Sequence, residues 1–242
     1  IHNIKVVLKG LFVQKQGGKR RMDLLTRLGN IDVDDLVMAI ESEDYRLMSF
    51  GFHRTVPECV MLWEQTRDIL QVETVLDGKL FSLQNDIAST MPYEGARLFV
   101  KHRVDAENIR NLARLKRMGY DPAQASPFFH AGGFVSVEKL TSMMGEPLEG
   151  WERILSYADV SRALSGVQEH SDIGSLLVEL ERSIDDFLSS ALETFRYSPF
   201  APENVLNFLW KKEIEAKNVR ILLVGIGNGA EKNVLRRLLR HV

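Results

Sequence analysis

The stretch Asn108-Ile109-Arg110-Asn111-Leu112 decides how this chain is organised, because two close copies of it occur elsewhere. Asn3-Ile4-Lys5-Val6-Val7 precedes it by 105 residues, and Asn218-Val219-Arg220-Ile221-Leu222 follows it by 110. A period near 105 is too long for a solenoid repeat of ~20–50 residues, so each repeat should be a small domain with its own core. The sequence therefore indicates a chain built by duplication.

Two further segments share nearly the same period. Residues 29–36 (GNIDVDDL) align without gaps on residues 133–140 (GFVSVEKL), 104 positions later. An acidic and apolar pattern also recurs at an offset of 108, joining Glu73, Leu76, Asp77 and Leu80 to Glu181, Ile184, Asp185 and Leu188. These matches predict three repeats, near 1–45, 46–150 and 151–242. The first begins inside its own motif at Ile1, so the chain is expected to be a fragment with a truncated first repeat.

Composition and periodicity favour an all-α fold. The chain has 45% hydrophobic and 26% charged residues and only 7 Pro in 242 residues, which fits packed helices. Apolar residues recur at three- and four-residue spacing, as between 173 and 188, whereas strand-like alternation is scarce. Each repeat should be a small helical bundle. One Cys excludes an internal disulfide framework, and no apolar run reaches the ~18–20 residues of a membrane span.

The formal net charge of −2 argues against a dominant nucleic-acid surface. Within the repeated motif, the apolar pairs Ile4/Val7, Ile109/Leu112 and Val219/Leu222 are spaced i,i+3 on one helix face, which is expected to face the core.

Asn is an unusual residue to keep in three helices, because its amide competes with backbone hydrogen bonds. We expect the amides of Asn3, Asn108 and Asn218 to bond partners within their own repeats. The following basic residue should pair with nearby acids. A ligand-binding role for the three Asn is the alternative, although most polar contacts in helical cores are structural.

Carboxylates precede the motif in the second and third copies, at Asp105, Glu107, Glu213 and Glu215. Within each copy they lie two residues apart on a helix, so the side chains diverge and cannot act on one substrate atom. Glu107 with Arg110 and Glu213 with Lys217 have the spacing of helical ion pairs instead.

The segment 219–230 ends in Gly225-Ile226-Gly227-Asn228-Gly229-Ala230, which satisfies the Gly-x-Gly-x-x-Ala fingerprint of dinucleotide-binding folds. A Rossmann unit needs a second strand and a later acid. The twelve residues after Ala230 contain no second strand pattern and no acid after Glu231. The aligned segment of the second repeat is helical in pattern. These glycines are therefore predicted to end a helix and open a loop.

Other catalytic signatures are missing from the sequence. No Gly-Lys-Ser/Thr phosphate loop occurs, and the six His show no i,i+4 pairing that suggests zinc. Cys59 lies among apolar residues and is interpreted as a small buried hydrophobe rather than a nucleophile. We therefore predict no catalytic residue, no cofactor and no metal.

The repeated residues make the chain resemble the C subunit of archaeal and bacterial A/V-type ATPases, whose family includes the d subunit of eukaryotic V-ATPases. The resemblance spans essentially the whole chain. It rests on the segments 1–5 (IHNIK), 104–110 (VDAENIR), 128–134 (FFHAGGF) and 213–220 (EIEAKNVR).

The resemblance implies a funnel-shaped protein in which three helical repeats are related by a pseudo-threefold axis. It implies a non-catalytic central-stalk subunit, a socket that couples the rotating shaft to the membrane proteolipid ring during ATP synthesis or hydrogen ion transport. The implied partners are the central-shaft subunits and the proteolipid ring, with no nucleic acid and no small-molecule substrate. The implied location is peripheral, on the cytoplasmic face of the membrane.

Shaft contacts are expected at polar loop tips, namely 17–21, with Lys19, Arg20 and Arg21, and 126–133. The alternatives are a helical scaffold outside any ATPase and a small dinucleotide-binding enzyme.

Overall fold

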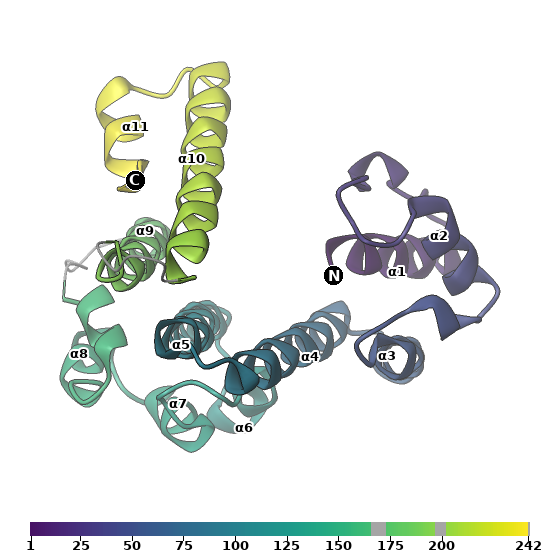
Figure 1. Ribbon diagram of the computed structural model, residues 1–242, viewed down its shortest axis with the longest axis horizontal. Helices are drawn as coiled ribbons and strands as arrows, with labels where there is room; N and C mark the ends of the chain where they lie inside the picture. Colours follow the sequence, from purple (N-terminus) through teal and green to yellow (C-terminus); the bar gives the residue numbers. More distant parts are fainter. Residues whose placement is uncertain (166–172, 197–201, 242) are drawn as a thin grey trace. The chain divides into compact units, whose positions relative to one another are not determined.

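The computed structural model describes residues 1–165, 173–196 and 202–241. The described residues contain eleven α-helices, five short 3₁₀ helices and no strand (Figure 1), which confirms the predicted all-α class. The α-helices are α1 His2–Lys15, α2 Val33–Glu41, α3 Phe52–Thr66, α4 Ile69–Thr90, α5 Glu94–Arg117, α6 Pro122–Ala125, α7 Val137–Met143, α8 Trp151–Ile154, α9 Ile173–Glu193, α10 Glu203–Gly227 and α11 Lys232–Leu238. The 3₁₀ helices are η1 Met22–Leu24, η2 Tyr45–Leu47, η3 Ser126–Phe128, η4 Leu148–Gly150 and η5 Asp159–Ala163.

The chain packs into two compact units, Ile1–Leu83 and Gln84–Val242. Helix α4 is continuous across the boundary between them. The three repeats expected at 1–45, 46–150 and 151–242, their pseudo-threefold arrangement and the funnel shape stay predictions.

The core of the first compact unit forms around α1. The motif residues Ile4 and Val7 are buried there with Leu36 of α2 and Leu76 of α4. Farther along α1, the ring of Phe12 stacks on Trp63 of α3 with 4.3 Å between centroids. Removing these side chains from water stabilises the unit by roughly 1.5–3 kcal/mol for each large residue.

Helix α5 is the centre of the second compact unit, and it packs against α9, α7 and η5. Ile109 and Leu112 of its motif are completely buried, as expected for a core face. Side-chain caps fix where the neighbouring helices begin. Asp121 forms a capping box at the start of α6, and Ser136 accepts a hydrogen bond from the Lys139 N–H at the start of α7.

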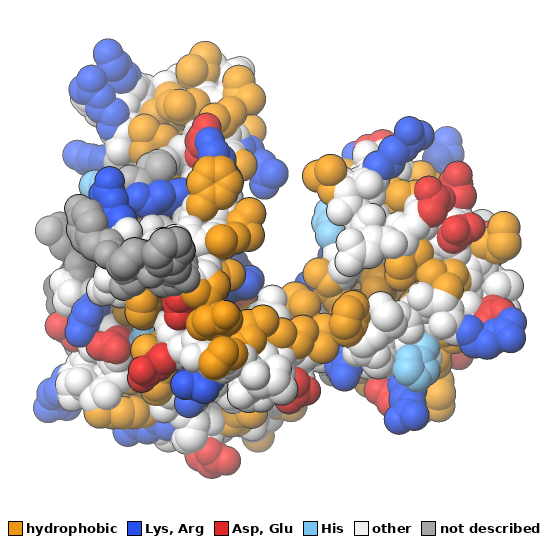
Figure 2. Space-filling model, viewed as in Figure 1, with side chains coloured by type: hydrophobic (Ala, Val, Ile, Leu, Met, Phe, Trp, Pro, Cys, Tyr) orange, Lys and Arg blue, Asp and Glu red, His pale blue; other side chains and the backbone are white. Residues whose placement is uncertain are grey.

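Helix α10 differs from the other two motif helices. The side chains of Asn207, Trp210 and Ile214 form a buried stripe near its N-terminal end. Val219 and Leu222 are 49% and 36% exposed, so the prediction that this third motif presents a core face is wrong. Hydrophobic side chains gather along α10 at the surface (Figure 2). The described parts of the chain contain no element that covers these residues.

The glycine-rich segment belongs to α10 and the turn after it. The helix continues to Gly227, and Gly229 has a φ of +69°, where glycine avoids the strain of a side chain. A Cβ on Gly225 would collide with the Leu235 side chain of α11, so glycine permits this close approach. The predicted end of a helix is confirmed here, and residues 219–224 form no strand.

Candidate functional site

The amide of each motif Asn closes a pair of hydrogen bonds with one backbone residue 22 or 23 positions downstream. In the first copy, Asn3 Nδ2 donates to Thr26 O at 2.7 Å, and the Thr26 N–H donates to Asn3 Oδ1 at 3.0 Å. Asn108 makes the same pair with His130, with both distances 2.8 Å, and Asn218 makes it with Arg240, with both 2.9 Å. The expected partner within each repeat is therefore present.

These clamps tie the middle of a motif helix to the loop that returns to it. The N–H and C=O of one loop residue are satisfied together, which matters most at Asn108, where the site is fully buried. An amide serves here because it offers a donor and an acceptor side by side. The geometry leaves the Asn108 amide engaged with protein, which fits the structural interpretation better than a ligand-binding one.

The basic residue after Asn forms an ion pair with a repeated acid. Lys5 Nζ lies 2.6 Å from Asp77 Oδ1 of α4, and Arg110 Nη2 lies 2.8 Å from Asp185 Oδ1 of α9. One helical turn later, a second pair of the same kind joins Lys9 to Glu73 at 2.5 Å and Arg114 to Glu181 at 2.6 Å.

In both helix pairs, the base that comes later in the sequence contacts the acid that comes earlier. Helices α1 and α4 are therefore antiparallel, helices α5 and α9 are antiparallel as well, and the two pairs are held by equivalent contacts. The equivalence follows the sequence periods of 105 for the bases and 108 for the acids.

The third copy breaks this pattern. Arg220 is exposed and makes no hydrogen bond or ion pair with any other described residue, so its predicted pairing with a nearby acid is wrong for the part of the chain described. Val224 occupies the position equivalent to Lys9 and Arg114.

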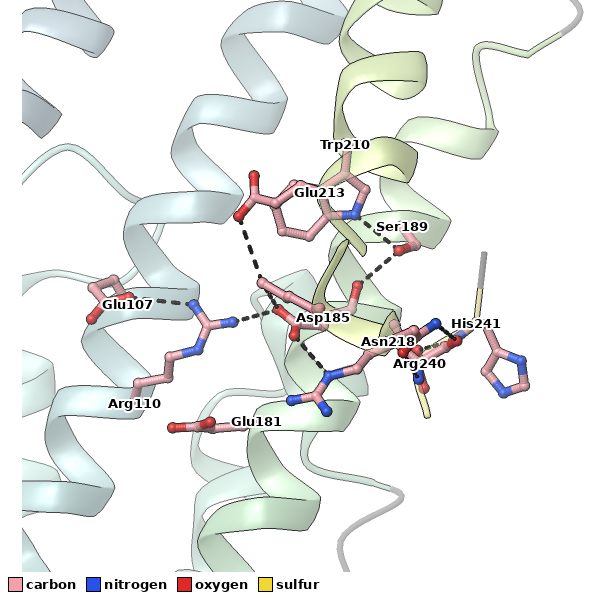
Figure 3. Close-up of polar contacts among 12 residues, drawn as sticks. Glu107, Arg110, Glu181, Asp185, Ser189, Trp210, Glu213, Asn218, Arg240 and His241 are labelled. Carbon is pink, nitrogen blue, oxygen red and sulfur yellow. Dashed lines mark hydrogen bonds and ion pairs between the residues drawn. The ribbon is translucent and has the colours of Figure 1, made fainter. Parts of the chain in front are cut away.

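Asp185 is the centre of a charged network that joins three helices and the C-terminal segment (Figure 3). Besides Arg110, its buried carboxylate accepts hydrogen bonds from Lys217 Nζ and Arg240 Nε, both at 3.1 Å. The three cations satisfy the acceptor sites of this one carboxylate. Their positive charge exceeds the single negative charge of Asp185 and lies close to the low-dielectric interior. Asp185 therefore connects the second motif to the third.

A neutral chain of hydrogen bonds extends this network on α9. Ser189 Oγ donates to the Asp185 backbone O at 3.0 Å, and Trp210 Nε1 donates to Ser189 Oγ at 2.9 Å (Figure 3). The Trp210 indole of α10 is thus held on α9.

The carboxylates next to the motifs mostly behave as their spacing predicted. Glu107 Oε2 lies 3.3 Å from Arg110 Nη1, and Glu213 Oε1 lies 3.7 Å from Lys217 Nζ. Both pairs are partly exposed, so each contributes at most a few tenths of a kcal/mol.

Asp105 has a role that its sequence pattern did not predict. Its buried carboxylate accepts the backbone N–H groups of Phe134 and Val135, each at 3.0 Å. Burial raises the pKa of the Asp105 carboxyl to about 6, although these two hydrogen bonds oppose the shift. A Cβ on Gly133 would collide with Asp105 Oδ1, so glycine permits the approach. The only available signal was the presence of Asp105 and Gly133 within two of the family segments.

The basic loop 17–21 is engaged with its own compact unit. Arg20 Nη1 pairs with Glu41, and the Arg21 guanidinium makes two hydrogen bonds to Asp23 at 2.7 and 2.8 Å. The Arg21 and Asp23 side chains are exposed, and Lys19 is exposed as well. Of the three residues expected to contact a shaft, Arg20 therefore has a clear role within the fold.

The second loop expected to form a polar tip, 126–133, is buried at its centre. Phe128, Phe129 and His130 are buried, and His130 is the backbone partner of Asn108. These three residues belong to the core, so the loop is not a polar tip. Its exposed part is restricted to residues 126–127 and 131–133, where Ser126 and Gly133 are themselves only half-exposed.

The described ranges contain neither a candidate metal site nor an accessible cysteine thiol. No three His, Cys, Asp or Glu side chains in these ranges are placed to hold a metal ion. The Cys59 thiol is buried, and burial raises its pKa to about 12, which agrees with its interpretation as a hydrophobe. In the same ranges, every helix is too short or too polar to cross a membrane.

Comparison with known proteins adds an independent observation. The family described as ATP synthase (C/AC39) subunit matches residues 1–238. The C subunit of the V-type sodium ATPase of Enterococcus hirae is 23% identical over 241 residues, covering 100% of this chain and 72% of that protein. The C subunits of the A-type ATP synthases of Methanocaldococcus jannaschii and Haloferax volcanii are 25% and 24% identical and cover 99% and 96% of this chain.

The chain spans 62% of the Methanocaldococcus protein and 68% of the Haloferax protein, so it corresponds to about two thirds of these relatives. The resemblance inferred from the repeated motifs is confirmed. Because the family match extends over residues 1–238, this chain belongs to the ATP synthase (C/AC39) subunit family.

Proposed function

We propose that this chain belongs to a non-catalytic central-stalk subunit of a rotary A/V-type ATP synthase or ATPase. The observation that carries the proposal is the family match over residues 1–238. In this role the protein is a socket between the rotating shaft and the proteolipid ring of the membrane, and it transmits torque between ATP chemistry and ion flow. Its place is peripheral, on the cytoplasmic face of the membrane.

The contacts within the protein support a part that transmits force. Three Asn clamps tie motif helices to their returning loops, and paired ion pairs hold α1 to α4 and α5 to α9. Close-packed helices cross-linked in this way are stiff and have low compressibility, which a torque-bearing spacer requires. A scaffold outside an ATPase needs the same stiffness, so the family match is what favours the rotary role.

Within this proposal, the loop 17–21 supplies a cationic shaft contact through Lys19 and Arg21. Both are exposed, and Arg21 is bonded only to its neighbour Asp23 among the described residues. A surface contact of this kind steers association and weakens as salt is added.

The experiment is reconstitution of a rotary ATPase from which this protein has been removed. We expect the depleted complex to hydrolyse ATP without moving ions, and the complete protein to restore ion transport driven by ATP. Restoration of transport by an unrelated helical protein, or unchanged transport after depletion, would contradict the proposal.

A further inference from the structure

A cleft lined almost entirely by charged side chains lies on the second compact unit, between α5, α9, α10 and the C-terminal segment. Eight of its nine lining residues are charged, and five of them are the cations Arg110, Arg114, Lys217, Arg220 and Arg240. We call it the basic cleft. Its volume of about 370 Å³ far exceeds the roughly 30 Å³ that one water molecule takes in the liquid, so a phosphate group fits together with bound water.

The residues that line the basic cleft carry two more positive than negative charges. The three carboxylates among them, Glu107, Glu181 and Asp185, each lie within 3.3 Å of an arginine nitrogen. Five cations surround these three acids. Like charges repel more strongly where water is partly excluded, and the Arg240 side chain is only 11% exposed. A bound anion would remove this repulsion.

Two guanidinium groups in the basic cleft have donors that the fold leaves unused. Arg220 makes no hydrogen bond or ion pair with a described residue. Arg240 donates through Nε to Asp185 and through Nη1 to the Leu238 O, whereas its Nη2 has no acceptor among the described residues. Arg110 and Arg240 lie on different sides of Asp185 (Figure 3). Guanidinium N–H groups form a planar fork that matches the oxygens of an oxyanion, so the free donors suit such a ligand.

The other two motif copies show what Arg220 lacks. Lys5 pairs with Asp77 and Arg110 pairs with Asp185, so in both copies an acid neutralises the base that stands two residues after the motif Asn. The third copy keeps the base, and no described acid pairs with it. An anion in the basic cleft would supply beside Arg220 the negative charge that the chain itself does not provide.

We propose that the basic cleft binds a doubly charged phosphate group, either as inorganic phosphate or at the end of a phosphate monoester. A dianion matches the two surplus positive charges, whereas a carboxylate or a phosphodiester carries only one negative charge. The phosphate oxygens accept hydrogen bonds from the free N–H groups of Arg220 and Arg240. The bound group thereby joins α10 to the C-terminal segment.

The test is isothermal titration of the purified protein with inorganic phosphate at about pH 8, where a phosphate group is mostly doubly charged. Ionic strength is held constant, because salt screens exposed charges. We expect saturable binding of one phosphate. Arg220→Gln should weaken it about 10-fold or more, through the loss of charge-assisted hydrogen bonds. Urea unfolding of this variant should be unchanged, since Arg220 has no described partner in the fold.

Arg117→Gln is the matched control. Arg117 is an exposed arginine of α5 outside the basic cleft, so the variant makes the same change in net charge and should bind phosphate within about 2-fold of the natural protein. Glu181→Gln gives the opposite sign. It removes a negative charge from the cleft and releases Arg114, so phosphate should bind about 3-fold or more tightly. A purely structural role of the lining residues predicts no such gain.

Glycerol 3-phosphate distinguishes the two forms of the ligand. Equal affinity for this monoester and for inorganic phosphate assigns the cleft to free phosphate, and tighter binding of the monoester assigns it to an organic phosphate. Three results would overturn the proposal: no saturable binding up to about 10 mM phosphate, binding that Arg220→Gln leaves unchanged, or competition by acetate as strong as that by phosphate. Binding only to vesicles that contain phosphatidylglycerol would assign the cleft to a membrane surface and would contradict the proposal as well.

Discussion

Asn108 and His130 form a closed pair of hydrogen bonds inside the second compact unit, with the Asn108 amide donating to the His130 O and accepting from its N–H, both at 2.8 Å. Asn108→Ala should lower the free energy of unfolding by about 2–4 kcal/mol, because it leaves two buried backbone groups unsatisfied at roughly 1–3 kcal/mol each. Urea unfolding measures the change.

Asn218→Ala is the matched control for that prediction. Its partner, Arg240, lies in a partly exposed site where water replaces the lost amide, so the loss should be about 1 kcal/mol or less. Equal losses for the two variants would show that burial does not set the strength of the clamp.

Asp185→Asn should cost about 3 kcal/mol or more, because it leaves Arg110, Lys217 and Arg240 around a site without its buried negative charge. The C-terminal segment should also loosen, with faster amide hydrogen exchange near Arg240. Asp77→Asn, which removes the equivalent but more exposed carboxylate, should cost only about 1 kcal/mol or less. Similar costs for both would contradict the central role given to Asp185.

Asp105 should make stability depend on pH in a direction opposite to that of most carboxylates. Its pKa is raised to about 6 in the folded protein, so between its ordinary pKa near 3.9 and about 6 the folded state binds more protons than the unfolded state. Stability linked to this group is complete below pH ~3.9 and is lost as pH rises to about 6.

The measurement for Asp105 is the unfolding free energy of the natural protein and of Asp105→Asn between pH 4 and 7. The unfolding free energy of the natural protein minus that of the variant should fall by about 2–3 kcal/mol as pH rises from 4. This difference should stay constant above pH ~6.5. A difference independent of pH would show that folding does not raise the pKa of Asp105.

Gly133→Ala should destabilise the protein by about 1–3 kcal/mol, because the new methyl group collides with the Asp105 carboxylate. Gly227→Ala is the control at the end of α10, where an added Cβ meets nothing within 4 Å. Calorimetry should give a lower melting temperature for Gly133→Ala. The melting temperature of Gly227→Ala should be almost unchanged.

The repeated Asn motif was enough to predict helices and local amide partners, because both depend on short-range chemistry within one repeat. Residue spacing likewise predicted the pair of Glu107 with Arg110. Both inferences required only helical geometry.

Features that depend on distant elements were not predictable in the same way. The pairing of Lys5 with Asp77 joins residues 72 positions apart, and the exposure of Val219 depends on what lies beside α10. The loop 126–133 contained polar and glycine residues that suggested a tip, but its Phe128, Phe129 and His130 are buried by packing around α5. Asp105 was not predictable because its partners are backbone N–H groups of a loop 29 and 30 residues away.

The proposed shaft contact has a separate test in charge reversal of single residues of the loop. Lys19→Glu should weaken binding to the shaft proteins without changing stability, since Lys19 is exposed. Arg20→Glu should instead lower stability, because it places two acids together at Glu41. Shaft binding that is unchanged by Lys19→Glu and Arg21→Glu together would exclude this loop.

The most direct test of the rotary role is to purify the complete protein from native membranes in mild detergent and identify the proteins that accompany it by mass spectrometry. The account predicts recovery of the ATPase head, shaft and proteolipid subunits in fixed stoichiometry. Recovery of this protein alone, from the soluble fraction, would contradict it.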